Sequence, residues 1–204
     1  MGKQRARWKC LLISLALLAI FLVSVYQGPA AILPQATAQV QTPSATCIPG
    51  RVTPSVTEGP FYKSGSPQRA SLVEPGMPGT KLVITGYVFS KSCRPVVGAW
   101  LDFWQADAQG TYDNAGYRLR GHQFTDGAAR YTLETVMPGE YPGRTPHIHV
   151  KVMAPNRPVL TTQLYFAGAA QNQSDALFRP ELLLQLHNAA SGKSATFNFV
   201  LELE

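Results

Sequence analysis

Two histidines stand one residue apart in the stretch PGRTPHIHVKV, in a chain that contains only four histidines. The apolar run around them predicts a strand, in which side chains at positions i and i+2 point to the same face. His147 and His149 could therefore reach one metal ion together, since imidazole is the commonest metal ligand in proteins. Such a pair can also lie on a half-exposed sheet face without a metal, so further ligands must be sought elsewhere.

Thiolate and carboxylate ligands are scarce near this pair. No cysteine is close by in the sequence, which argues against a zinc–thiolate site. The first acidic residue after His149 is Asp175, which disfavours a cupin-type site and an iron(II) site with two histidines and one carboxylate. His122 and His187 have no paired neighbour, so we interpret them as structural or surface residues.

Two tyrosines in turns offer a different kind of donor. Tyr141 stands six residues before His147 in PGEYPGR, and Tyr112 stands in AQGTYDN, after a long β-rich run. A buried tyrosine often needs only one hydrogen-bond partner, and these two could be packing residues. A phenolate, however, is a hard anionic ligand that suits ferric iron, and a metal can deprotonate a phenol far below its free pKa. Two phenolates and two neutral imidazoles would leave one positive charge on Fe(III).

Several motifs in order resemble the intradiol ring-cleavage dioxygenases, the family of protocatechuate 3,4-dioxygenase and catechol 1,2-dioxygenase. The resemblance covers most of residues 53–170. The motifs that carry it are TEGPFY (57–62), GAWLDFWQADAQGTYDN (98–114), RGHQFTD (120–126), TVMPGEYPGRTPHIHVKV (135–152) and TTQLYF (161–166). The large helical N-terminal dimerisation region of catechol 1,2-dioxygenases has no counterpart here.

The resemblance implies a non-haem Fe(III) enzyme that cleaves a catechol-type ring between its two hydroxylated carbons with O2, giving a cis,cis-muconate-type product. The iron ligands implied by the motifs are Tyr112, Tyr141, His147 and His149. Tyr141 and His147 would be the axial pair, and Tyr112 and His149 would be equatorial.

Further active-site residues follow from the same resemblance. Arg144 matches the active-site arginine of the family, and Gln163 in TTQLYF matches its glutamine near the iron. Tyr62 in TEGPFY and Tyr117 in NAGYRLRG are candidate substrate contacts, although each could instead be a packing residue. The small-molecule partners implied are a catechol-type substrate, whose identity stays open, and O2.

A non-catalytic function is the alternative. The strands and turns from Gly86 to Pro142 also fit the pattern of transthyretin-like and carboxypeptidase-regulatory-like modules, which mostly bind or brace in the cell envelope. That pattern does not require Tyr112, Arg144, His147 or His149. The presence of all these residues favours the enzyme.

The elements that must position these residues are mostly strands. The chain has 17 glycines and 16 prolines, and its aromatic residues are spread along its length, which favours many short strands over a helical bundle. We predict an all-β sandwich of about seven to nine strands at 47–204, with long loops forming the metal site. The clearest helical pattern after the N-terminal segment is at 174–189. Strand patterns occupy 81–90, 96–107, 147–155, 159–168 and 194–204, and residues 125–143 have a turn, strand and turn pattern. Residues 110–124 are loop-like.

The N-terminus reads as a targeting segment. Four basic residues precede an apolar run at 10–26, and residues 1–38 contain no acid. This layout predicts a signal peptide or a membrane anchor helix over 1–38, followed by a linker at 39–46. Because positive charge stays inside, the domain is expected outside the cytoplasm, secreted, periplasmic or anchored.

Two cysteines remain after that segment. In an oxidising compartment leftover cysteines often pair, so we predict a disulfide between Cys47 and Cys93 that pins the start of the domain to the sandwich. The net charge of +6 arises mostly from the N-terminal segment, and 14 basic residues face 12 acidic ones in the rest. We therefore expect no nucleic-acid partner. The sequence leaves the oligomeric state open.

Overall fold

The computed structural model describes residues 46–204. The expected signal peptide or anchor at 1–38, and the expected linker up to residue 45, lie outside the described residues. Within residues 46–204, no helix is long and apolar enough to cross a membrane. The described elements are β1 (Lys81–Ser90), β2 (Trp100–Trp104), β3 (Arg120–Phe124), β4 (Arg130–Val136), β5 (His147–Met153), β6 (Leu160–Phe166), η1 (Ala170–Gln173), η2 (Pro180–Leu182), β7 (Leu183–Ala189), β8 (Gly192–Thr196) and β9 (Phe199–Leu201).

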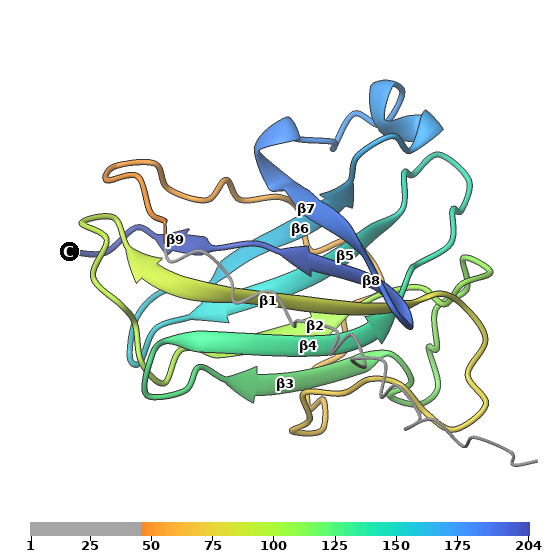
Figure 1. Cartoon of the computed structure of the whole chain (residues 1–204), viewed down its shortest axis with the longest axis horizontal. Helices are drawn as coiled ribbons and strands as arrows, with labels where there is room; N and C mark the ends of the chain where they lie inside the picture. The colour runs from red at the N-terminus through yellow and green to blue at the C-terminus, as the bar shows by residue number, and fades with distance from the viewer. Residues whose placement is uncertain (1–45) are drawn as a thin grey trace, which may run out of the picture. The chain divides into compact units, whose positions relative to one another are not determined.

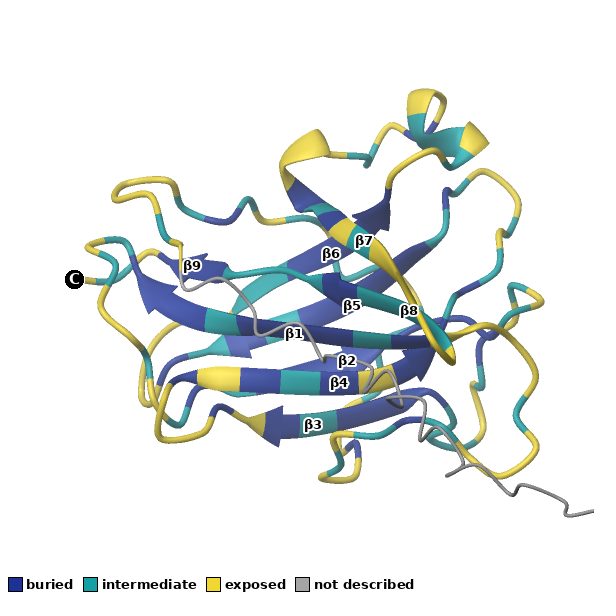
Figure 2. Cartoon of the chain, in the orientation of Figure 1, coloured by how far each residue is buried: buried dark blue, intermediate teal, exposed yellow. Residues whose placement is uncertain are grey.

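The strands form one mixed sheet in the order β3-β2-β5-β6-β7-β8-β1-β4, with β9 paired to β1 (Figure 1). The all-β prediction and the predicted strand number are thus confirmed for residues 46–204. Strands β3, β2, β5 and β6 make one half of the sheet, and β7, β8, β1 and β4 make the other. Buried apolar side chains from both halves make a shared hydrophobic core. Figure 2 shows most strands largely buried, whereas β7 is mostly exposed, β8 is mostly intermediate, and the connections are mainly exposed or intermediate.

The predicted helix at 174–189 is wrong. This stretch forms the short 3₁₀ turn η2 and then strand β7. Burial alternates along it, since Leu182 and Leu184 are buried whereas Gln185 and His187 are exposed. This two-residue period fits a strand that pairs with β6 on one side and β8 on the other. The pairing with these two strands therefore outweighs the helical propensity of the leucine-rich sequence. Residues 120–124, read as loop from the sequence, form β3.

The segment 67–72 pairs with the two terminal strands of the sheet, β3 and β4. Its first part bonds to β3, with Arg69 N–H donating to the His122 carbonyl and His122 N–H donating to the Pro67 carbonyl. Its second part bonds to β4, where Leu72 N–H donates to the Glu134 carbonyl and Glu134 N–H donates to the Ala70 carbonyl. The segment therefore occupies both ends of the sheet.

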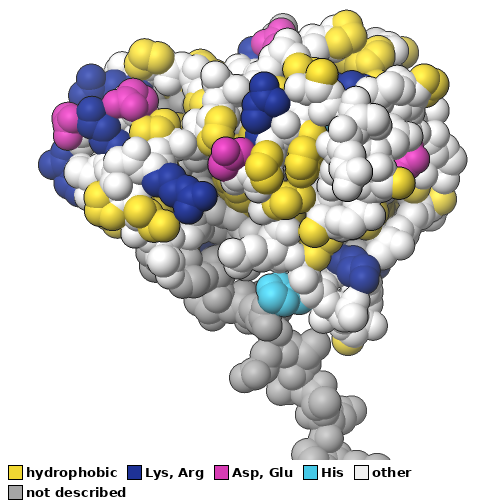
Figure 3. All heavy atoms as spheres, turned by 90° about the horizontal axis from the view of Figure 1, so that it is seen from above, with side chains coloured by type: hydrophobic (Ala, Val, Ile, Leu, Met, Phe, Trp, Pro, Cys, Tyr) yellow, Lys and Arg dark blue, Asp and Glu magenta, His cyan; other side chains and the backbone are white. Residues whose placement is uncertain are grey.

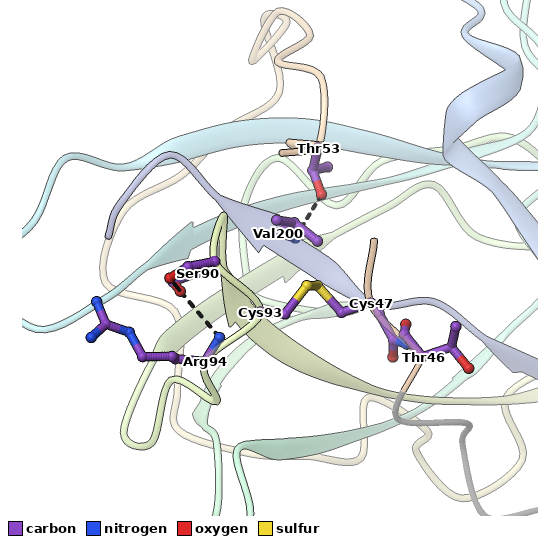
Figure 4. Close-up of a disulfide and its surroundings, with 9 residues drawn as sticks. Thr46, Cys47, Thr53, Ser90, Cys93, Arg94 and Val200 are labelled. Carbon is purple, nitrogen blue, oxygen red and sulfur yellow. Dashed lines mark hydrogen bonds between the residues drawn. A yellow bond between two sulfur atoms is a disulfide. The ribbon is translucent and has the colours of Figure 1, made fainter. Parts of the chain in front are cut away.

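The start of the described chain is tied to the sandwich by the predicted disulfide. Cys47 and Cys93 are bonded, with a sequence separation of 46 and their Cα atoms 5.7 Å apart (Figure 4). Thr53 makes two hydrogen bonds to Val200 of β9. Its N–H donates to the Val200 carbonyl, and its side-chain oxygen accepts from the Val200 N–H. In the surface view of Figure 3, basic side chains lie apart or next to acidic ones.

Candidate functional site

His147 and His149 lie on the face of β5 that is turned away from the shared core. The alternate residues Ile148, Val150 and Val152 face that core and are fully buried. The two histidines are nevertheless only 2% and 1% exposed, because other segments cover this outer face. The predicted same-face placement is confirmed, and their Nε2 atoms lie 3.0 Å apart.

The hydrogen bonds of His147 indicate its tautomer. Its Nδ1 lies 2.6 Å from the Thr145 carbonyl oxygen, a pure acceptor, so Nδ1 carries the proton. Burial, reinforced by the nearby Arg144 cation, lowers the pKa of His147 to about 4. Burial and its neighbour His147 hold the pKa of His149 well below its ordinary value. Both rings are therefore neutral near pH 7, and Nε2 of His147 presents a lone pair.

A close contact between two glycine-containing turns brings the tyrosines together. Gly110 precedes Tyr112 in the β2–β3 connection, and Gly139 precedes Tyr141 in the β4–β5 connection. A Cβ atom added to Gly139 would lie 2.5 Å from the Gly110 nitrogen, so only glycine allows the two backbones to approach this closely. The Asp107 carbonyl accepts hydrogen bonds from both Gly110 N–H and Gly139 N–H.

Both tyrosines point toward the histidine pair. The hydroxyl of Tyr141 lies 3.4 Å from His147 Nε2, and the ring of Tyr112 is edge-on to that of Tyr141 with centroids 5.8 Å apart. Phe61 stacks on Tyr112 at 4.3 Å. Burial first, and then the neighbouring Tyr141, raises the pKa of Tyr112, while burial raises the pKa of Tyr141. Without an added positive charge, both phenols stay protonated at pH 7.

The four residues fit a metal that takes nitrogen and phenolate oxygen. The described residues include no group of three or more histidine, cysteine, aspartate or glutamate side chains that could hold one. The Tyr112 hydroxyl and His149 Nδ1 are buried without a hydrogen-bond partner, which is costly for polar atoms. A cation bound by the Nε2 atoms and the phenols would give the Tyr112 oxygen a partner and would use the lone pair of His147 Nε2.

Arg144 and Gln163, the two further active-site residues that the resemblance implies, lie next to these donors. Arg144 Nη1 lies 3.4 Å from the Tyr141 oxygen, and Nη2 donates to Gln163 Oε1 at 2.5 Å. Gln163 faces His149 across the β5–β6 pair, and its Nε2 donates to the Thr57 carbonyl at 2.9 Å. Arg144 therefore brings a fixed positive charge to the edge of the donor group.

The segment 57–62 and Trp104 cover the ring of His149. A Cβ atom on Gly59 would lie 3.4 Å from His149 Cε1, and Trp104 stacks on the imidazole with centroids 4.7 Å apart and planes 9° from parallel. Trp104 is buried in the smaller core cluster around Tyr112, whereas Trp100 is only partly buried, with its ring near His122.

The two candidate substrate residues are not brought into the donor group. The Tyr62 hydroxyl donates to Asp102 Oδ2 at 3.2 Å, although its ring packs edge-on against Trp104. The Tyr117 hydroxyl donates to the Ser64 carbonyl at 2.8 Å. Each therefore has a local structural partner, and both are partly exposed.

Three polar residues at the site gave no signal in the sequence. Asp175 pairs with Arg144, and Thr145 bonds to both Asp175 and His147. Arg120 is 2% exposed and donates to the carbonyls of Phe61 and Asp113, which flank the Tyr112 ring. The contacts of Asp175 with Arg144 and Thr145, and that of Arg120 with Phe61, join segments far apart in sequence, so no local spacing reveals them. His122 bonds to Ser66 and His187 is exposed, as expected of structural and surface histidines.

Comparison with known proteins gives consistent matches. Residues 57–203 match the family model described as Dioxygenase. The solved dioxygenase domain of a dioxygenase carbohydrate-binding protein fusion from Streptomyces sp. SirexAA-E is 54% identical, with a TM-score of 0.74, covering 75% of this chain and 99% of that one. Chlorocatechol 1,2-dioxygenase of Rhodococcus opacus is 29% identical over 75% of this chain and 74% of its own length.

Other relatives differ in length. The protocatechuate 3,4-dioxygenase alpha chain of Pseudomonas putida is 33% identical over 58% of this chain and 71% of its own length. The chain spans about half the length of several curated catechol 1,2-dioxygenases, including that of Candida albicans.

Proposed function

Because the chain belongs to the intradiol ring-cleavage dioxygenase family, we propose that it is a non-haem Fe(III) dioxygenase. Its substrate would be a catechol-type aromatic, cleaved with O2 between the two hydroxylated carbons to give a cis,cis-muconate-type product. The observation that carries this proposal is the convergence of two neutral histidines and two protonated tyrosines beside a paired arginine.

The residues proposed to hold the iron are Tyr112, Tyr141, His147 and His149. Bound ferric iron would supply Lewis-acid activation of the catechol oxygens. The raised pKa of each phenol means that both tyrosines must lose their protons to become ligands. The Thr145 carbonyl keeps the proton of His147 on Nδ1, so Nε2 is free to bind.

Tyr141 and Arg144 would handle protons and charge. As a phenolate, the Tyr141 oxygen is the proposed base that accepts a proton from a catechol hydroxyl, and it lies 3.4 Å from Arg144 Nη1. Arg144 would then stabilise negative charge that develops on the substrate. Gln163 holds Arg144 in this orientation and is itself fixed by the Thr57 carbonyl.

The walls of the site would exclude water and guide the ring. Phe61 and Trp104 pack against Tyr112 and His149, which leaves an apolar surround. Tyr62, whose ring packs against Trp104, and Tyr117 remain proposed substrate contacts. Contact with a substrate would require their hydroxyls to exchange their present partners, Asp102 and the Ser64 carbonyl.

We also propose that the domain works outside the cytoplasm, with the N-terminal segment as signal or membrane anchor. The disulfide between Cys47 and Cys93 supports this location, because such bonds persist in oxidising compartments. Fractionation of cells that express the full chain, followed by mass measurement of its N-terminus, tests the location and the cleavage.

The decisive test of the activity uses the purified protein after iron reconstitution. We expect one tightly bound iron, a reddish-brown tyrosinate-to-iron absorption band, a shift of that band on adding catechol, and O2 uptake with a panel of catechols. Tyr112→Phe should abolish or strongly alter the band, whereas Tyr62→Phe, which changes a tyrosine outside the donor group, should leave it nearly intact. A colourless protein that takes up no iron would instead support a non-catalytic, transthyretin-like or carboxypeptidase-regulatory-like binding module.

A further inference from the structure

Asp175 contacts two residues of the site, Arg144 and Thr145. It lies on the β6–β7 connection, far in sequence from the donor residues. Its side chain is 2% exposed. One carboxylate oxygen accepts from Arg144 Nε at 2.9 Å and from the Thr145 N–H at 3.0 Å, and the other accepts from the Leu177 N–H at 2.9 Å. Although burial alone would raise the pKa of Asp175, these hydrogen bonds hold it below its ordinary value, so the carboxylate is charged.

The same carboxylate oxygen therefore holds two neighbouring residues with different tasks. Arg144 carries the charge that faces Tyr141, and Thr145 presents the carbonyl that fixes the His147 ring. The side chain of Thr145 is also tied to the β6–β7 connection, since its hydroxyl donates to Asn172 Oδ1 at 2.6 Å. Thr145 therefore keeps a second tie to this connection when the Asp175 carboxylate is replaced.

The remaining contacts of Arg144 show why it needs this partner. Its Nη2 bonds to Gln163, whose Oε1 is also within 2.9 Å of the Tyr165 hydroxyl. These are neutral partners, so within the described residues Asp175 is the carboxylate paired with this cation. Two fixed directions, from Nε to Asp175 and from Nη2 to Gln163, leave Nη1 aimed at the Tyr141 oxygen.

We propose that Asp175 is a positioning residue for the active site, which locks the Arg144 guanidinium in a single orientation. The inference rests on the proposed function only in so far as Arg144 serves catalysis. The pairing of Asp175 with Arg144 can be tested independently, in metal-free protein.

The test is a double-mutant cycle with Asp175→Asn, Arg144→Gln and the double variant. In metal-free protein, Asp175→Asn should raise the unfolding equilibrium constant at least about tenfold in the native background, since a charged hydrogen bond is lost. In the Arg144→Gln background, the same change should alter it less than about threefold, because the partner is already absent. Equal effects in both backgrounds would show that Asp175 only braces the loop, and would overturn the proposal.

Kinetics of the iron-loaded protein provide the second arm. Asp175→Asn should lower kcat about tenfold or more with iron content unchanged, and should have less than about a twofold effect once Arg144 is replaced. An additive loss of kcat would contradict the proposal even in an active enzyme. If no variant or native protein consumes O2, the proposed function fails while the metal-free coupling still decides the role of Asp175.

Asp126→Asn is the matched control. Asp126 also accepts two backbone N–H groups and pairs with an arginine, Arg130, but it lies on the exposed turn between β3 and β4. Its replacement should leave kcat and the absorption band unchanged. If Asp175→Asn fails to fold, Arg144→Lys serves instead, because the single nitrogen of a lysine cannot reproduce the two fixed directions, from Nε and from Nη2, that orient the guanidinium. Its kcat should match that of Arg144→Gln within about threefold, and full activity with lysine would overturn the proposal.

Discussion

The backbone of Gly110 lies against the carbonyl group of Glu140, so that a Cβ atom on Gly110 would stand 2.1 Å from that oxygen. Gly110 also has φ of +79°, a conformation that other residues adopt only with strain. This contact joins the turn that carries Tyr112 to the turn that carries Tyr141. The distance between the two phenols therefore depends on a residue that has no side chain.

Replacing Gly110 with alanine should separate the two tyrosine turns. We expect the free energy of unfolding to fall by at least about 1–2 kcal/mol, from the positive φ alone, and the tyrosinate-to-iron band to weaken or shift. Thermal unfolding and absorption spectra measure the two effects. Gly127→Ala is the control, since a Cβ atom there meets nothing within 4 Å. A Gly110→Ala protein with the native spectrum would contradict the role assigned to this contact.

Iron binding should release one proton fewer in Tyr112→Phe than in the native protein. Burial raises the pKa of the Tyr112 phenol, so it is protonated at pH 7 and must lose its proton to bind. Addition of the same iron reagent to weakly buffered metal-free protein, with a pH indicator, gives the proton count. Tyr62→Phe should release as many protons as the native protein, and equal release from all three proteins would argue against Tyr112 as a ligand.

The metal-free protein should lose stability as the pH falls below 6.5. Burial in the folded state lowers the pKa of His147 to about 4. Between pH 6.5 and 4, His147 is therefore protonated in the unfolded chain but neutral in the folded chain. This residue alone should cost about 3 kcal/mol of unfolding free energy across that range, and His149 adds to it with the same sign.

Urea unfolding at several pH values measures this loss. His147→Gln should flatten the dependence, whereas His187→Gln, at an exposed position on β7, should leave it unchanged. A native and a His147→Gln protein with the same slope between pH 6.5 and 4 would show that His147 is not held neutral.

Loss of the disulfide should destabilise the domain. The bond closes a loop with a sequence separation of 46 residues, which predicts a loss of about 3–4 kcal/mol in the Cys47→Ser/Cys93→Ser variant. Urea unfolding with and without reductant tests this, and the reduced native protein should behave like the double variant. Alkylation of both thiols in unreduced native protein would show that the bond does not form.

The donor residues could be predicted because their signals are local. The spacing of His147 and His149 defines a strand face by itself, and Tyr112 and Tyr141 stand in glycine-containing turns that the sequence marks. The partners of the site could not be predicted in this way. Asp175 reaches Arg144 only because β6 returns beside β5, and its sequence neighbours look like an ordinary polar loop.

The wrong helix at 174–189 has a similar cause. Leucine-rich sequence favours a helix locally, but the pairing of β7 with β6 and β8 satisfies its backbone and buries Leu182 and Leu184. Tyr62 is a candidate substrate contact because of its motif, but its hydroxyl donates to the buried carboxylate of Asp102 instead of facing the donor group. Burial raises the pKa of that carboxyl group, and hydrogen bonds from Ser66 and Tyr62 counter the shift.

The segment 67–72 bears on how two copies of the domain could meet. Strands at the two ends of a sheet normally present unpaired N–H and carbonyl groups to which a strand of another molecule can bind. Here the backbone groups of His122 and Glu134 are already bonded to this segment. A strand of another molecule could pair at these two positions only after the hydrogen bonds between the segment 67–72 and strands β3 and β4 were broken. A dimer that leaves this segment in place would therefore have to use other surfaces of the domain.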